Sequence, residues 1–222
     1  MKTNNSSTVT DIEGNVYNTV KIGTQVWMLE NLKTTKYNDG TAIPLVTDST
    51  AWTYLSTPAY CWYKNDAATY KNKYGALYNW YVVNTGKLAP TGWHVATDAE
   101  WTTLENYLTA NGYNYDGSTS GDYYAKSLAA TTDWATDSGT GTIGNDLTKN
   151  NRSGFSALPG GYRNNDDGTF NVVGDNGYWW SSTESSSGYA WYRDVGYRGS
   201  SVYRDNDGKQ NGFSVRCVRD SQ

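Results

Sequence analysis

Alternating polar and apolar side chains mark the first strands of the chain. Residues 15–28 alternate in this way on both sides of Gly23. Alternation places successive side chains on opposite faces of a strand, and a glycine between two such runs favours a turn. The pattern therefore predicts two short strands joined by a turn. Residues 59–63 are a further short strand candidate, and residues 38–41 (Asn-Asp-Gly-Thr) form a turn signal.

A helical period appears after residue 72. Apolar side chains recur at Tyr74, Leu77, Tyr78 and Tyr81. The spacing i, i+3, i+4 and i+7 places them on one face of a helix. It predicts a helix over about 72–84 with Leu77 in the core.

A second helix is predicted over about 98–110. Thr97 and Glu100 have the spacing of a capping box, in which each side chain satisfies a backbone N–H at the start of a helix. Asn111 and Gly112 are a plausible end. We expect an apolar stripe to face the core, formed by Trp101, Leu104 and Leu108.

The second half of the chain predicts strands. Residues 113–150 are rich in Gly, Ser, Thr and Asp and predict an irregular excursion. Short aromatic runs then recur about every ten residues between turn signals, which favours an antiparallel meander. The strand candidates are residues 178–180, 190–193, 201–204 and 212–218, with Trp179 and Trp180 expected in the core. The fold class is therefore α+β: two helices packed on a twisted antiparallel sheet, with irregular loops.

Composition supports one ordered domain and excludes two classes of partner. Aromatic residues make up 15% of the 222 residues, which gives the apolar mass that a disordered chain lacks. The net charge of −4 argues against nucleic-acid binding, and no apolar run is long enough for membrane insertion. We expect a polar leader or linker over residues 1–10 and a single domain over 11–222. The leader region has no apolar segment typical of a signal peptide.

Catalytic signatures are missing from the sequence. His94 is the one histidine, and Gly92–Val95 predicts a strand end there. One histidine cannot assemble a multi-histidine zinc site. The sequence contains no G-x-S-x-G, P-loop, G-x-G-x-x-G or C-x-x-C motif, so we expect no enzyme activity. Cys61 and Cys217 leave two alternatives open, a disulfide that closes most of the chain or two buried thiols.

Two oxygen-rich segments raise the question of calcium. Residues 165–168 and 205–208 each contain Asp, Asn and Gly, but neither completes an EF-hand spacing. The same residue types are preferred in turns, so we interpret both segments as solvated turns. We expect no cofactor, and calcium is the alternative.

Seven sequence blocks carry a family resemblance. They are residues 14–17, 26–32, 74–81, 90–95, 154–163, 178–184 and 212–219. In this order they resemble the Fibrobacter succinogenes major paralogous domain family over about residues 11–220. The resemblance implies a C-type-lectin-like fold, of the variant shared with formylglycine-generating enzyme. It also implies an extracellular, cell-surface or phage-particle location, in gut bacteria or their bacteriophages.

Departures from the family limit what the resemblance implies. The family often has a cysteine where this chain has Ala89, so Cys217 lacks its usual partner. Formylglycine-generating enzyme uses reactive cysteines near its C-terminus, where this chain offers Cys217 alone. Oxidase activity is therefore not carried over, and the resemblance favours a non-enzymatic adhesin or receptor-binding protein. The alternatives are a calcium-dependent or Trp-stacking glycan-binding lectin and an enzyme of the same fold.

The resemblance also implies a mechanism of diversity. Relatives are variable proteins of diversity-generating retroelements, in which adenine-directed mutagenesis rewrites Asn codons near the C-terminus. Such codons yield Tyr, Ser, Asp, Gly, Asn and Arg, which also suit a binding surface. The candidate ligand-binding positions of these types in residues 177–219 are Ser185, Tyr189, Asp194, Gly196, Arg198, Gly199, Ser201, Asp205, Asn206, Asp207 and Asn211. Their ligand would be a protein or glycan on a cell surface.

A variable surface requires a separate framework. In a meander, side chains alternate between core and solvent, so one face can vary only if the other holds the fold. We therefore expect nine of the candidate positions to be mostly exposed and to cluster on one side: Asp194, Gly196, Arg198, Gly199, Ser201, Asp205, Asn206, Asp207 and Asn211. The residues expected to be mostly buried are Trp191, Tyr197, Val202 and Val215.

Overall fold

A computed structural model describes residues 7–221 of the chain. Strands β1 (Thr8–Thr10), β2 (Val16–Ile22) and β3 (Gln25–Met28) form consecutive antiparallel pairs. The two strands predicted around Gly23 are confirmed. Residues 8–10, assigned from sequence to a leader, pair with β2 and so belong to the folded domain. Residues 1–6 of that segment lie outside the described residues.

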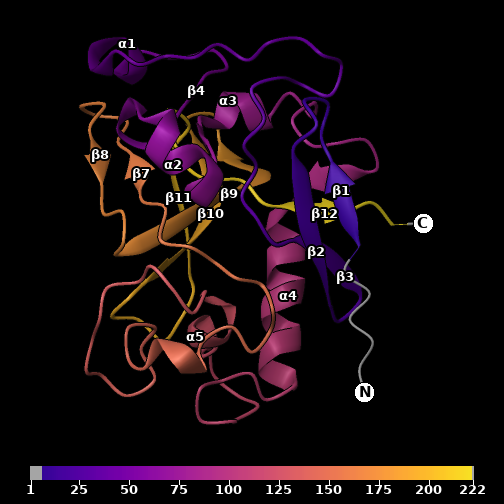
Figure 1. The fold of residues 1–222 in the computed structure, drawn as a ribbon, viewed down its shortest axis with the longest axis vertical. Coiled ribbons are helices and arrows are strands. Elements are labelled where there is room, and N and C mark those ends of the chain that lie inside the picture. The colour runs from indigo at the N-terminus through magenta and orange to yellow at the C-terminus, as the bar shows by residue number, and fades with distance from the viewer. Residues whose placement is uncertain (1–6, 222) are drawn as a thin grey trace.

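The end of the chain completes this first sheet. Its strand order is β1-β2-β3-β12-β6, with β6 at Trp93–Val95 and β12 at Cys217–Arg219. Val218 pairs with Trp27 of β3 on one side and with His94 of β6 on the other. Figure 1 shows the yellow β12 beside the indigo strands of the N-terminal region. The sequence pattern placed residues 212–218 in the C-terminal meander, and that assignment is wrong. The last strand lies between two strands from the first half of the chain.

The helix predicted over 98–110 is confirmed as α4 (Asp98–Ala110). Thr97 accepts a hydrogen bond from the Glu100 backbone N–H, and the Glu100 carboxylate accepts one from the Thr97 N–H, which completes the capping box. The predicted stripe is buried: Trp101, Leu104 and Leu108. α4 packs beside the sheets as the longest helix of the described chain (Figure 1).

The prediction of one helix over 72–84 is wrong. Helix α2 (Ala67–Tyr74) ends at Gly75, where φ is +77° and an added Cβ would lie 2.6 Å from the Leu32 carbonyl oxygen. A strand β5 (Leu77–Tyr78), paired with β4 (Tyr60–Cys61), and a short helix α3 (Trp80–Val83) follow. Leu77 is buried as expected, but so are its neighbours on both sides. With both sides buried, apolar spacing does not distinguish a helix from a strand.

Residues 113–150 form the predicted irregular excursion. Its regular structure is limited to α5 (Ala125–Leu128) and a 3-10 turn at Leu147–Lys149. Further small elements complete the described fold: α1 (Ser49–Thr53), a 3-10 turn at Tyr63–Asn65, β7 (Tyr162–Arg163) and β8 (Phe170–Asn171). Within residues 7–221 no helix combines the length and apolar character required to cross a membrane.

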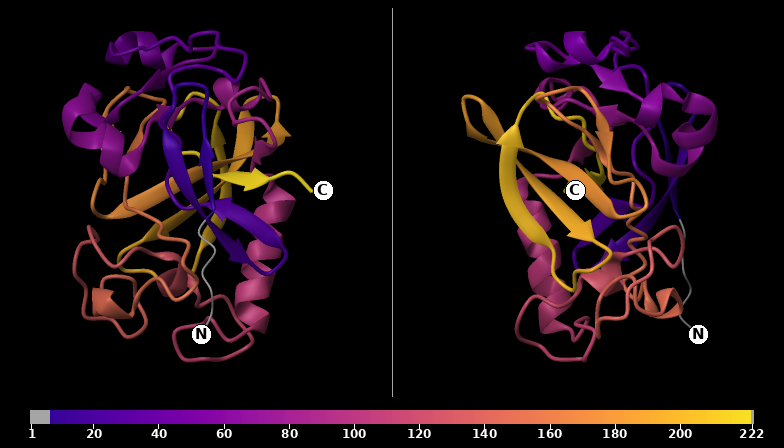
Figure 2. Two further views of the ribbon diagram at one scale, coloured as in Figure 1. Left: turned by 45° about the vertical axis from the view of Figure 1, so that its right-hand side comes forward. Right: turned by 90° about the vertical axis from the view of Figure 1, so that its left-hand side faces the viewer.

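The predicted meander is confirmed for three strands. β9 (Asn176–Ser186), β10 (Tyr189–Gly196) and β11 (Tyr203–Gly208) form an antiparallel sheet in the order β11-β10-β9 (Figure 2). Helices, a curled antiparallel sheet and several small sheets together make a mixed α+β fold. Residues 205–208, interpreted from sequence as a turn, are part of β11.

Candidate ligand-binding face of the C-terminal sheet

Both faces of the β9–β11 sheet contribute to the core. Trp179 and Trp180 are adjacent in β9 and are both buried, so their side chains enter different hydrophobic clusters. Trp179 packs with Trp101 of α4, with ring centroids 6.4 Å apart. Trp180 packs against Phe213 at 4.3 Å on the opposite face. The expectation of one core face and one solvent face is therefore too simple for this sheet.

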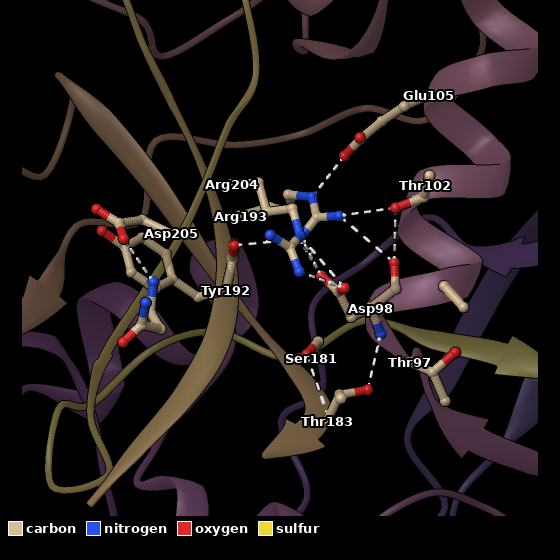
Figure 3. A network of polar contacts seen from close by, with 12 residues as sticks. Thr97, Asp98, Thr102, Glu105, Ser181, Thr183, Tyr192, Arg193, Arg204 and Asp205 are labelled. Carbon is tan, nitrogen blue, oxygen red and sulfur yellow. Dashed lines mark hydrogen bonds and ion pairs between the residues drawn. The ribbon is translucent and has the colours of Figure 1, made fainter. Parts of the chain in front are cut away.

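A buried arginine joins the sheet to α4. Arg193 of β10 has a side chain only 1% exposed, and it donates to Glu105 at 2.5 Å and to Asp98 at 2.7 Å. The outer Arg204 of β11 also donates to Asp98 at 2.8 Å, and its guanidinium lies 3.5 Å from the centroid of the Trp191 ring. Figure 3 shows both arginines reaching toward the helix. This network fixes the sheet from its helix side.

The two carboxylates of the network respond differently to burial. Burial raises the pKa of Glu105, and Arg193 lowers it only in part. Burial also acts to raise the pKa of Asp98, but hydrogen bonds from Arg204 and Arg193 hold that pKa below its usual value. Both carboxylates therefore depend on their arginine partners to remain charged at low solvent exposure.

The opposite face of the sheet carries tyrosines and carboxylates. Among the side chains that the strand register places on it are five that we call the acidic face: Tyr178, Tyr192, Asp194, Asp205 and Asp207. Figure 3 shows Asp205 directed away from the arginine network. Tyr178 and Tyr192 are half-buried, with ring centroids 6.1 Å apart, and Asp205 is exposed. Near β9 this face is covered by Phe213, and it opens toward the edge strand β11.

Burial and like charge perturb the carboxyl groups of the acidic face. Burial, together with the nearby Asp205 carboxylate, raises the pKa of Asp194 to about 6. Burial is also the main cause of a raised pKa at Asp207. The pKa values of Tyr178 and Tyr192 are raised by burial and then by Asp194. These groups would gain from a ligand that supplies hydrogen-bond donors.

The structure brings together six of the eleven candidate positions. Asp194, Asp205 and Asp207 lie on the acidic face. A hollow of about 380 Å³ adjoins it, lined by Asp194 and, among other residues, by Gly196, Arg198 and Gly199. The hollow also takes in Asn176 and Tyr203, which were not among the candidates. Asn176 pairs with Gly196 and Tyr203 with Asp194 in the strand register, which the structure reveals and the sequence does not.

The other five candidates lie elsewhere. Asn206 is on the helix side of β11, opposite Trp191. Ser185 and Tyr189 flank the β9–β10 turn, at the far end of β10 from Gly196. Ser201, half-buried in the β10–β11 connection, donates to the Asp122 carboxylate at 3.2 Å.

Of the nine positions expected to be exposed, Arg198 and Asp205 are exposed and six are half-buried. Asn211 contradicts its expected exposure most clearly. It is only 1% exposed, and its side chain accepts a hydrogen bond from the Asn165 N–H at 3.1 Å and donates to the Gly208 carbonyl at 3.3 Å. It is therefore a structural residue that ties two loops together.

The expected framework is buried only in part. Val215 is fully buried, whereas Trp191, Tyr197 and Val202 are half-buried. Trp191 lies beneath the exposed Arg204 rather than in the core. The buried framework of this region is instead formed by Trp179, Trp180, Arg193, Val195 and Phe213. Arg193 was missed from sequence.

The two cysteines and the histidine have structural surroundings. Cys61 and Cys217 are free and buried, and burial raises the pKa of the Cys61 thiol to about 12 and that of Cys217 still higher. Neither thiol has the access or the thiolate character of a nucleophile. His94 lies in β6 as predicted and bonds Glu100 at 2.7 Å and Asp220 at 2.6 Å. In residues 7–221 no group of three or more His, Cys, Asp or Glu side chains is arranged to hold a metal ion.

Comparison with known proteins gives a family. No curated protein and no solved structure matches the chain. The family model described as the Fibrobacter succinogenes major domain matches residues 20–219, from within β2 to the end of β12. This match spans most of the described fold, including the central strand β12 and the whole β9–β11 sheet. The chain therefore belongs to the Fibrobacter succinogenes major domain family.

Proposed function

We propose that this chain is a non-enzymatic ligand-binding domain, an adhesin or receptor-binding protein, whose acidic face and adjoining hollow contact the ligand. The observation that carries the proposal is that different residues of the β9–β11 sheet hold the fold and reach solvent. Trp179 and Arg193 hold the sheet from its helix side, and Trp180 packs into the core at the β9 end of the other face. Asp194 of β10 and Asp205 of β11 have no partner among the ion pairs of the described residues. Such a surface can change without loss of the fold.

The residue types of the acidic face suit recognition. Tyrosine supplies contact area at low conformational cost, and small polar residues adapt their hydrogen bonds. Tyr203 is 59% exposed at the edge strand, next to the hollow. The ligand in this proposal is a protein or glycan on a cell surface, and the domain acts outside the cell or on a phage particle. A retroelement would diversify the six clustered positions rather than all eleven.

We further propose a C-type-lectin-like arrangement for the fold. Its support is the pairing of strands from the two ends of the chain, β3 with β12, and a long irregular excursion beside the helix α4. Sugar stacking on tryptophan has little support in the C-terminal sheet. Trp179 and Trp180 are buried, and Arg204 covers the Trp191 ring.

The test is a pair of displayed libraries. The first randomises five surface positions: Asp194, Arg198, Tyr203, Asp205 and Asp207. The second randomises five framework positions as a matched control: Trp179, Trp180, Val195, Phe213 and Val215. Protease resistance measures folding, and selection against lysozyme as an arbitrary protein target measures binding.

We expect most members of the surface library to resist protease and some to bind lysozyme. Arg198, Tyr203 and Asp205 are exposed, where substitutions usually change stability by less than about 0.5 kcal/mol each, and Asp194 and Asp207 are half-buried. We expect the framework library to lose resistance, because it creates cavities in two clusters. Equal loss of resistance in both libraries would refute the proposed binding face.

A further inference from the structure

A second hollow, of about 490 Å³, lies within the irregular excursion and shares no residue with the acidic face. We call it the excursion hollow. Its wall includes Tyr115, Asn145, Lys149, Asn150 and Arg152, and Lys126 of α5 also borders it. No Asp or Glu is among its lining residues. Its charged side chains are therefore all cationic, in contrast to the acidic face.

Lys126 gives the hollow a buried positive charge. The side chain is almost fully buried, and its ammonium donates to the carbonyl oxygens of Thr142 and Asp146 at 3.2 Å and to the Asn150 Oδ1 at 2.8 Å. The Asn145 carbonyl also accepts. Within residues 7–221 no carboxylate forms an ion pair with this ammonium. An ammonium has three donors, so Lys126 is saturated and acts on a ligand through its charge alone.

Arg152 and Lys149 supply donors at the surface. Arg152 is exposed and donates to two backbone carbonyls, those of Gly112 at 3.2 Å and Asn114 at 3.4 Å. A guanidinium has five N–H donors, so several stay available, and its planar fork matches a carboxylate. Lys149 is 74% exposed and lies 3.2 Å from the Asp146 carboxylate at the rim.

Neutral groups give the excursion hollow a surface for a sugar ring. Tyr115 is 41% exposed, and its ring is held edge-on by Tyr123 with centroids 6.1 Å apart. The ring also lies close to Gly141, where an added Cβ would lie 2.3 Å from it. An aromatic side chain fixed in this way, in a hollow also lined by amides and hydroxyls, can contact both the apolar and the hydroxylated parts of a saccharide.

We propose that the excursion hollow binds a carboxylate-bearing saccharide, of the hexuronate class. The carboxylate pairs with the Arg152 guanidinium, assisted by Lys149 and by the buried charge of Lys126. The sugar ring lies against Tyr115. This site is independent of the proposed function of the acidic face.

Calorimetric titration with trigalacturonate, and with neutral galactotriose as the matched probe, tests the proposal. We expect trigalacturonate to bind at least about tenfold more tightly than galactotriose, as a charge-assisted bidentate contact requires. Arg152→Gln should weaken trigalacturonate binding about tenfold, and Tyr115→Ala should weaken both probes. Lys21→Gln, an exposed lysine on β2 outside the hollow, is the charge-matched control and should change affinity less than about twofold.

The melting temperature of each variant is measured to check that the fold is retained. Asp194→Asn should leave trigalacturonate binding unchanged, which separates this site from the acidic face. The proposal is overturned if trigalacturonate gives no binding at about 10 mM, a concentration at which even weak sites fill. It is equally overturned if galactotriose binds as tightly, or if Arg152→Gln behaves like Lys21→Gln.

Discussion

Replacing Arg193 with methionine should destabilise the domain by about 3–5 kcal/mol, as expected when one partner of a buried ion pair is removed. The Arg193 side chain is 1% exposed, and those of its partners Asp98 and Glu105 are 17% and 16% exposed. Methionine fills a similar apolar volume, so packing loss is small. The cost arises because two carboxylates remain in a poorly solvated place without their shared cation. Protonation of Glu105, whose pKa burial already raises, limits the loss.

Urea unfolding followed by far-UV circular dichroism at pH 7 measures this free energy. Arg204→Met is the matched control, because Arg204 pairs with the same Asp98 but is 42% exposed. Exposed pairs contribute about 0–1 kcal/mol, so the control should lose little. Combining Arg193→Met with Asp98→Asn and Glu105→Gln should recover part of the loss. The reasoning fails if Arg193→Met costs no more than Arg204→Met, or if neutralising both carboxylates recovers nothing.

Three further predictions concern the same region. Trp180→Ala should cost about 3–5 kcal/mol in urea unfolding and Trp191→Ala clearly less, since Trp180 is 0% exposed and Trp191 half-buried; equal costs would contradict this. Asp194 has a pKa of about 6 in the folded state and about 3.9 in the unfolded state. The free energy of unfolding should therefore be highest below pH 4 and fall by roughly 1–3 kcal/mol as the pH rises through 6. Asp194→Asn should remove that loss, and an unchanged pH profile would argue against the raised pKa. Thr97→Ala should cost about 1 kcal/mol through the capping box, whereas Thr97→Ser should cost far less; similar melting temperatures for both would contradict the cap.

Local signals predicted the parts of the fold that local interactions determine. The capping box of Thr97 and Glu100 and the apolar stripe after it are contained within one helix, and α4 formed as expected. The prediction of a helix over 72–84 failed because residues on all sides of this segment are buried. The contrast between apolar and polar positions that reveals a helical period is therefore missing. The place of β12 depends on pairing between residues almost 200 positions apart, such as Val218 and Trp27. No local pattern specifies that partner.

The candidate site was predictable to a similar extent. Residue type alone identified Asp194 and Asp205, which the strand register brings together. Residue type could not separate them from Asn211, whose amide is held inside a loop contact. Arg193 was overlooked, although a signal existed: a charged residue in an aromatic strand needs a buried partner, and Asp98 and Glu105 are spaced seven residues apart on one face of α4.

The position of β12 at the middle of the first sheet has a consequence for synthesis. β1, β2 and β3 are translated first, but β3 acquires its second neighbour only when residues 217–219 have left the ribosome. Until then β3 presents an open edge, and β6 has no strand beside it. A chain interrupted anywhere in the preceding β9–β11 region would lack this closing strand and remain open to proteolysis. Only chains in which β9, β10 and β11 have been fully translated can therefore complete the first sheet and become stable.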